Sequence, residues 1–402
     1  MGNITRVGTI DYSDLVYTSD LADIDKYALT AGDVIFNRTN SKEWVGKVAF
    51  YDGSVPAIYA GYLVRFKPVG ILSEYVVSAM CSPYERAWCS AVKTDGVNQS
   101  NINVQKLKRF LIPVPPLAEQ RRIVAVLDEC LGYVDEIEQN QAELESLLAK
   151  ARSKVLDLAI RGKLVAQDPA DEPASALLER IRAEKLQMVA DGRLKKKDVA
   201  RDSVIYRGED NSYYEQRMCS EARIVEEALY DLPDSWAWAR LGLVSDYGSA
   251  PSASPDDIDN GAWILDLEDI EKNTGRILKF VTLSDRPSLS IKRPFKSGQL
   301  LYSKLRPYLN KVLIAPKEGF CTSEILPINL FAGCVPEYLR VFLMSDFFLA
   351  YANRCSYGVK MPRLGTTDGQ MALIAFPPTN EQRRIASAVE ELFEYLEALT
   401  TT

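Results

Sequence analysis

The sequence predicts an α+β protein built from two β-rich domains, each followed by a long helix. The passage IPVPPLAEQRRIVAVLDE at residues 112–129 returns as IAFPPTNEQRRIASAVEE at 374–391, which is 262 positions later. A helical pattern follows each copy, and short runs typical of β-strands precede each copy. The sequence therefore indicates a duplicated unit, which consists of a β-rich domain followed by a long helix.

The first predicted domain covers residues 1–115. YALTAGDVIFNRTN (27–40) reads as a turn followed by an alternating strand. GKVAFYDG (46–53) and AIYAGYLVRFKP (57–68) read as further strands.

A long helix is predicted over 116–162, started by Pro115 and Pro116 and ended by Gly162. Its apolar residues step by four and three, as in a coiled coil. The seam consists of Ile123, Leu127, Cys130, Val134, Ile137, Gln141, Leu144, Leu148, Ala151, Val155 and Leu158. Gln141, its only polar member, either sets the register or lies at a hydrated gap.

Residues 163–231 are predicted to form a connector rather than part of a core. A helical pattern at 174–190 follows the break QDPADEP, and GRLKKKD (192–198) reads as a solvated basic turn.

The second predicted domain covers residues 232–378 and repeats the layout of the first. In FKSGQLLYSKLRPYLNKVLIA (295–315), Gly298 corresponds to Gly32, and the loop SKLRPYLNK corresponds to NRTNSKEWVGK. The globular segments are therefore duplicated, more faintly than the helices.

The closing helix is predicted over 379–402, with seam residues Ile385, Val389, Leu392, Leu396 and Leu399. A single amphipathic helix cannot bury its own seam, so we expect the two repeat helices to pack on each other. The alternative is that each helix packs on its own domain. The Glu-Gln-Arg-Arg clusters at 119–122 and 381–384 either cap the helices or contact the domains.

The composition argues against an enzyme. The chain has 402 residues, no histidine and seven cysteines without a CxxC pair. This excludes His-based catalytic triads and argues against a zinc site and for reduced cytoplasmic thiols. No phosphate loop or GxGxxG motif occurs, and no apolar run is long enough to cross a membrane.

Local charge favours nucleic-acid binding although the net charge is −7. Six basic residues and no acidic one lie between Lys292 and Lys311, interleaved with Tyr, Ser and Asn. Polar stretches before each Pro-Pro pair, DGVNQSNIN (95–103) and YGVKMPRLGTTDG (357–369), have similar chemistry. The candidate DNA-binding residues of the first domain are Asn37, Arg38, Thr39, Asn40, Ser41, Lys47, Asn98, Gln99, Ser100 and Asn101. Those of the second are Lys292, Arg293, Tyr302, Ser303, Lys304, Arg306, Tyr308, Lys311, Lys360 and Arg363.

Several passages together resemble type I restriction–modification specificity subunits. They are PLAEQRRIVAVLDE, LAIRGKLVAQDPADEPASALLERI, LPDSWAWARLG, GQLLYSKLRPYLNK and MPRLGTTDGQMALIAFPPTNEQRRI, which follow one another along nearly the whole chain. The resemblance implies two target-recognition domains, each reading half of a split double-stranded DNA sequence. It implies that the helical conserved regions form an antiparallel coiled coil that spaces them.

The resemblance also implies partners and cofactors. The chain would be non-catalytic and would dock two methyltransferase subunits that bring S-adenosylmethionine and methylate adenine in phage defence. Motor–nuclease subunits that use ATP and Mg²⁺ would join for restriction. Against the family pattern, the counterpart of LPDSWAWARLG (232–242) would fall about thirty residues before Met1, and the second helix is shorter than the first. We therefore expect a chain shortened at both termini.

Two other functions are compatible with these residues. One is a specificity module of a related phage-defence system. The other is a coiled-coil scaffold whose β-rich domains bind protein.

Overall fold

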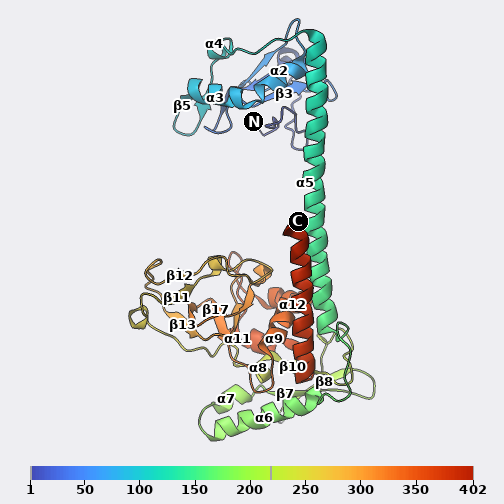
Figure 1. The fold of residues 1–402 in the computed structure, drawn as a ribbon, viewed down its shortest axis with the longest axis vertical. Helices are drawn as coiled ribbons and strands as arrows, with labels where there is room; N and C mark the ends of the chain where they lie inside the picture. The colour runs from blue at the N-terminus through green and yellow to red at the C-terminus, as the bar shows by residue number, and fades with distance from the viewer. Residues whose placement is uncertain (1, 218–219, 402) are drawn as a thin grey trace. The chain divides into compact units, whose positions relative to one another are not determined.

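The computed structural model describes residues 2–217 and 220–401, in which helices and strands are mixed (Figure 1). It divides into two compact units, Met1–Glu143 and Leu144–Thr402, each with its own hydrophobic core. The α+β class predicted from the sequence is confirmed. Within the described ranges, no helix combines the length and the apolar character that a membrane crossing requires.

The core of the first unit is a three-stranded antiparallel sheet in the order β3-β1-β4. Its strands are β1 (Asp33–Asn37), β3 (Val48–Tyr51) and β4 (Leu63–Phe66). All five residues of β1 are buried because it is the central strand. Helices α2 (Ser73–Met80) and α3 (Pro83–Val92) supply Val76, Val77, Met80 and Cys89 to the same core as Val34, Phe36, Val45, Val48 and Ile102.

Smaller elements surround this sheet. They are α1 (Leu21–Tyr27), β2 (Thr39–Asn40), β5 (Thr94–Asp95), β6 (Ser100–Asn101) and α4 (Val104–Leu107). Strands β2, β6 and β5 form a second small antiparallel sheet.

The second unit contains a sheet of the same design, in the order β15-β14-β17. Its strands are β14 (Leu300–Ser303), β15 (Val312–Ile314) and β17 (Ile325–Ile328). Helices α9 (Pro336–Met344) and α10 (Asp346–Cys355) follow, as α2 and α3 follow in the first unit.

The register of the two central hairpins shows the duplication in detail. Phe36 pairs with Val48 in the first unit, and Tyr302 pairs with Val312 in the second. The turn glycines ahead of the central strands, Gly32 and Gly298, both have positive φ, at 90° and 78°. Glycine adopts this conformation without the steric cost that other residues meet. The predicted repeat of the globular segments is therefore confirmed.

Further strands enlarge the second unit. A four-stranded sheet has the order β12-β11-β16-β13, in which β11 runs parallel to β16, and a two-stranded sheet joins β10 to β18. These strands are β10 (Ala237–Arg240), β11 (Trp263–Leu265), β12 (Val281–Thr282), β13 (Lys292–Phe295), β16 (Gly319–Thr322) and β18 (Leu373–Phe376). Short helical elements connect them: α8 (Leu241–Val244), η1 (Pro255–Asp257), η2 (Leu267–Asp269), η3 (Pro307–Leu309) and α11 (Thr366–Met371).

The segment predicted to be a connector contributes to the core of the second unit, so that expectation was wrong. Helix α6 (Ala174–Ala190) buries Ala174, Leu177, Leu178 and Ile181 in the main cluster. Its Lys185 is also buried, because its Nζ meets Asp202 Oδ1 at 2.6 Å and donates to the Gly242 carbonyl at 3.0 Å. The remaining elements here are α7 (Lys196–Val199), β7 (Ser203–Arg207), β8 (Tyr213–Arg217) and β9 (Arg223–Ile224).

The two long helices are α5 (Leu117–Ile160) and α12 (Thr379–Thr401). The predicted end of α5 at Gly162 is confirmed: Gly162 has φ 66°, and the Gly162 and Lys163 amides donate to the Ala159 and Leu158 carbonyls. This is the bonding pattern of a Schellman cap.

Within the second unit, the last turns of α5 pack antiparallel to α12 (Figure 1). Leu156 and Ile160 share a buried cluster with Ile385 and Val389. Arg152 Nη2 lies 3.0 Å from Glu397 Oε1. The expectation that the repeat helices meet therefore holds over this part of α5.

The seam of α5 divides into a covered and an uncovered part. Leu148 is buried, and Val155 and Leu158 are partly buried. Farther toward the N-terminus, Val134 and Ile137 are 49% and 56% exposed, and Leu127, Cys130, Gln141 and Leu144 are exposed as well. On α12, Leu392 and Leu396 are partly buried and Leu399 is exposed. Ile123, at the start of the α5 seam, is partly buried, so the uncovered part of the seam runs from Leu127 to Leu144.

A matching joint fastens each long helix to the globular part before it. Gln120 Oε1 accepts from the Leu72 amide at 2.9 Å, and its Nε2 donates to the Pro115 carbonyl at 2.8 Å. Gln382 makes the same two bonds, to the Val335 amide and the Pro377 carbonyl, both at 2.8 Å.

Tyrosines complete both joints, since the Tyr75 and Tyr338 hydroxyls donate to the Pro113 and Ala375 carbonyls. The contact interpretation of the Glu-Gln-Arg-Arg cluster is thus confirmed for its glutamines. Arg384 also makes such a contact, with Asp171 Oδ2 at 2.7 Å, whereas Arg121 and Arg122 are exposed.

Candidate nucleic-acid interface

In the second unit, the loop after β14 has a shape fixed by two left-handed residues. Arg306 (φ 50°) and Asn310 (φ 47°) flank the single turn of η3. Asn310 is buried, and its Nδ2 donates to the Met344 carbonyl at 2.8 Å. Non-glycine residues adopt this conformation uncommonly, and here the hydrogen bond of Asn310 holds the loop at its second left-handed residue.

A second loop is joined to the first by backbone bonds. Residues 357–363 form a hairpin in which Tyr357 and Arg363 exchange hydrogen bonds of 3.1 and 2.9 Å. The Leu364 amide donates to the Lys304 carbonyl at 3.0 Å, and the Arg306 amide donates to the Pro362 carbonyl at 2.7 Å. The structure thus brings together two polar stretches that lie far apart in the sequence.

The first unit has the same junction. The Ile102 amide donates to the Arg38 carbonyl at 2.8 Å, and Thr39 pairs with Asn101 in the β2–β6 ladder. The equivalent pair in the second unit is Leu305 with Arg363. We call each pair of joined loops a reading platform: residues 38–42 with 94–101 in the first unit, and 304–311 with 357–364 in the second.

The second platform is basic. Burial is the main cause that lowers the pKa of Lys304, and the neighbouring Arg293 and Arg363 charges lower it further, against the opposing effect of Glu324. Arg363 Nε donates to Glu324 Oε2 at 3.0 Å, which holds the guanidinium in place and raises its pKa. Several predicted residues therefore concentrate positive charge at one location, as phosphate contacts require.

The first platform is polar rather than basic. Asn98 and Gln99 are exposed at its hairpin, Ser41 is exposed beside it, and Asn101 Nδ2 donates to Thr39 Oγ1 at 2.7 Å. Arg38 and Asn40 are partly buried. Asn and Gln side chains suit hydrogen bonding to base edges.

Several predicted site residues are buried, which argues against direct DNA contact by their side chains. Asn37, Tyr302 and Ser303 belong to the central strands β1 and β14, where both faces are covered. Ser100 is also fully buried, and its hydroxyl donates to Asp95. The alternation of apolar and polar residues along the sequence could not predict which strand is central in its sheet.

Two predicted lysines of the second unit have internal partners. Lys292 is 2% exposed, and its Nζ lies 3.5 Å from Asp266 Oδ1. Lys311 Nζ donates to the Leu267 carbonyl at 2.6 Å, and burial lowers its pKa. Both lysines therefore hold the loop 266–269 against neighbouring strands. Tyr308 and Lys360 remain exposed on the second platform.

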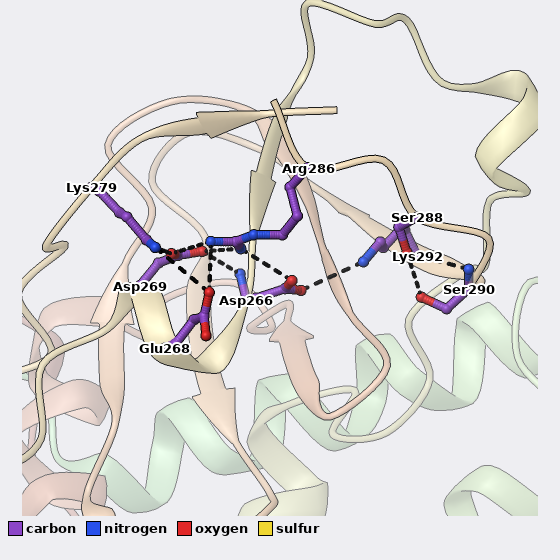
Figure 2. A network of polar contacts seen from close by, with 8 residues as sticks. All are labelled: Asp266, Glu268, Asp269, Lys279, Arg286, Ser288, Ser290 and Lys292. Carbon is purple, nitrogen blue, oxygen red and sulfur yellow. Dashed lines mark hydrogen bonds and ion pairs between the residues drawn. The ribbon is translucent and has the colours of Figure 1, made fainter. Parts of the chain in front are cut away.

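Figure 2 shows the polar network to which Lys292 belongs. Arg286 donates to both carboxylate oxygens of Asp269, at 2.7 and 2.8 Å, and to Asp266 at 3.1 Å. The Asp269 carboxylate is the main cause of the raised pKa of Arg286. Lys279 approaches the same carboxylate at 3.5 Å. These ion pairs connect and stabilise the loops between β11 and β13.

Sequence reasoning missed Trp44 and Arg6 in the first unit. Trp44 is 46% exposed, with the Arg6 guanidinium 4.9 Å and the Lys47 ammonium 5.3 Å from its ring centroid. Lys47 itself is buried at 8% exposure, and burial lowers its pKa, with Arg6 adding to the effect. The signal was a tryptophan inside the basic loop SKEWVGK. Arg6 carried no sequence signal.

Comparison with known proteins shows which protein family the sequence is similar to. Residues 2–146 match the family model described as type I restriction modification DNA specificity domain. The type I restriction enzyme EcoDI specificity subunit of Escherichia coli is 25% identical over 290 residues, which cover 72% of this chain and 56% of that protein. The chain is similar to type I restriction enzyme specificity subunits.

A second relative extends the match. The EcoEI specificity subunit of Escherichia coli is 26% identical over 391 residues, covering 81% of this chain and 61% of that protein. This chain thus spans somewhat more than half the length of these specificity subunits.

A solved structure supports the fold. It comes from a description of complex assembly and conformational transition of the type I R-M system. It aligns with a TM-score of 0.52 at 18% identity, covering 92% of this chain and 76% of that chain. At this identity the likeness supports the fold alone.

Proposed function

We propose that the chain is a non-catalytic specificity subunit that reads a bipartite double-stranded DNA target, one half with each reading platform. The observation that carries the proposal is the repeated junction. The bond from Ile102 to Arg38 in one unit recurs as the bond from Leu364 to Lys304 in the other. A single chain with two equivalent reading surfaces is equivalent to a dimer that binds two half-sites.

The helices α5 and α12 are proposed to space the two platforms as an antiparallel coiled coil. The contacts of Arg152 on α5 with Glu397 and with the Phe393 ring on α12 support this pairing. The exposed seam from Leu127 to Leu144 leaves apolar surface that a longer helical partner would cover.

Catalysis is proposed to come from partner subunits. Two methyltransferase subunits would dock on the chain, bring S-adenosylmethionine and methylate adenine in each half-site. Motor–nuclease subunits using ATP and Mg²⁺ would complete a restriction complex. The similarity to specificity subunits supports this division of labour.

The test is to express the full chain with its candidate methyltransferase subunit and to map adenine methylation across the host genome. We expect a bipartite methylated motif. Exchanging residues 232–378 for those of a relative should change one half of the motif and leave the other half unchanged. Methylation that does not depend on this chain would reject the proposal and favour a protein-binding scaffold.

A further inference from the structure

The hairpin of each reading platform carries a fully exposed valine at its tip. Val97 is 100% exposed and Val359 is 102% exposed. Each follows a glycine, and 262 positions separate them, the same spacing that relates the two helix motifs. Each valine also lies four residues before the junction residue of its platform, Asn101 or Arg363. The two valines therefore occupy equivalent places.

The backbone holds both tips in defined hairpins. The Gly96 amide donates to the Gln99 carbonyl at 2.7 Å, which leaves Val97 and Asn98 as the central turn residues. In the second unit, Gly358 has φ 97° and directly follows the bonded pair Tyr357–Arg363. An apolar side chain that is fully exposed to solvent contributes no burial of apolar surface to the stability of the fold. This holds for the valine at the tip of each of the two loops.

The surroundings favour nucleic acid over protein as the partner. Val97 is followed by Asn98 and Gln99, which are exposed and suited to base edges. Val359 is followed by the exposed Lys360, and its hairpin is bonded to the basic Lys304 loop. Val97 stands among polar residues, whereas Val359 shares its hairpin with the exposed Tyr357 and Met361. A protein-docking surface would present a broader contiguous apolar patch than either tip provides.

Valine cannot bind phosphate, because it has neither charge nor a hydrogen-bond donor in its side chain. On DNA it can contact only apolar parts of the bases, such as a thymine methyl group or an opened base step. We propose that Val97 and Val359 are apolar base contacts that help to determine the two half-site sequences. This inference rests on the proposed function of the reading platforms.

The experiment uses the full chain assembled with its methyltransferase subunit. The probe is a fluorescein-labelled duplex that carries the motif returned by methylation mapping, and its anisotropy is followed between 50 and 300 mM salt. We expect Val359→Ser and Val97→Ser each to weaken binding about tenfold at every salt concentration, with an unchanged slope of log affinity against log salt. Val359→Thr, which keeps one methyl group, should lie between wild type and Val359→Ser.

Lys304→Gln is the matched control, because losing a phosphate contact should lower the slope by about 1. In methylation maps, Val97→Ser should relax one half of the motif and Val359→Ser the other half. Unchanged thermal unfolding of the serine variants is expected, since both side chains are fully exposed.

The outcomes separate the two proposals. If the wild-type assembly does not bind the duplex, the proposed function fails and the inference fails with it. If the wild-type assembly binds while both serine variants bind within twofold and keep the motif, only the inference is overturned. A serine variant that lowers the salt slope as Lys304→Gln does would also overturn it, because the valine would then act on phosphate contacts.

Discussion

Gln382 Oε1 accepts a hydrogen bond of 2.8 Å from the backbone amide of Val335, the residue that precedes helix α9. This bond, with the bond from Gln382 Nε2 to Pro377, fixes the start of α12 to the globular part of the second unit. Gln120 makes the same pair of bonds in the first unit. The repeated sequence passage therefore forms the same helix-to-domain joint in both units.

We expect Gln382→Ala to lower the free energy of unfolding of the second unit by about 1–3 kcal/mol, because it leaves the buried Val335 amide without a partner. Gln139→Ala, at an exposed position of α5, is the control and should change stability by less than about 0.5 kcal/mol. Denaturant unfolding followed by tryptophan fluorescence measures both. Equal stabilities of the two variants would contradict the role of the joint.

Lys304→Gln and Arg363→Gln should each weaken DNA binding and lower the slope of log affinity against log salt by about 1, because each removes a cation from the second platform. Lys196→Gln, at an exposed position of α7 outside the platforms, should leave the slope unchanged. Titrations of the assembled complex at several salt concentrations measure the slope. A slope that responds equally to all three substitutions would reject the placement of the interface.

The stability of the first unit should depend on the protonation of Glu85. Glu85 is 2% exposed and accepts a hydrogen bond from Cys89 Sγ at 2.7 Å. Burial raises the pKa of Glu85 from 4.5 to about 7, against the smaller lowering effects of Cys89, Arg6 and Arg86. The folded state thus binds this proton more tightly than the unfolded state. Its stabilising contribution is complete below about pH 4.5 and is lost as the pH rises through about 7.

Glu85→Gln should remove that dependence, which is on the order of 3 kcal/mol between pH 5 and 8 at most. Hydrogen exchange of the α3 amides, converted to opening free energies in the full-length chain, measures it. Parallel pH profiles for wild type and Glu85→Gln would show that Glu85 does not titrate in this range.

Leu177→Ala should lower the free energy of unfolding by about 2–5 kcal/mol, because Leu177 is 2% exposed in the core of the second unit. Leu186→Ala on the same helix is the matched control, since Leu186 is 52% exposed, and its effect should stay within about 0.5 kcal/mol. If both variants are equally mild, α6 is a connector after all.

The helices were the most predictable part of the fold. The spacing of apolar residues from Ile123 to Leu158 and the glycine at 162 predicted α5 closely. The repeat itself predicted the matching sheets, because Gly32 and Gly298 begin equivalent turns. These signals are local, so a single sequence contains them.

The packing of α6 and the identity of the exposed site residues were not predictable in the same way. The segment around α6 was predicted to be a connector, but Lys185 is buried and pairs with Asp202, which follows it by 17 residues. Tyr302 and Ser303 were predicted to belong to the DNA-contacting surface, but both lie in the central strand β14 and are buried. Both outcomes depend on contacts between distant segments, which local patterns do not encode.

The helix-to-domain joints have a consequence for how such chains can diversify. Gln120 and Gln382 bind backbone amides and carbonyls, not side chains. Apart from the tyrosines that complete it, Tyr75 and Tyr338, the joint therefore places little demand on the amino acids of the domain that it holds. A domain of different sequence can therefore be held at the start of the same helix by the same two backbone hydrogen bonds.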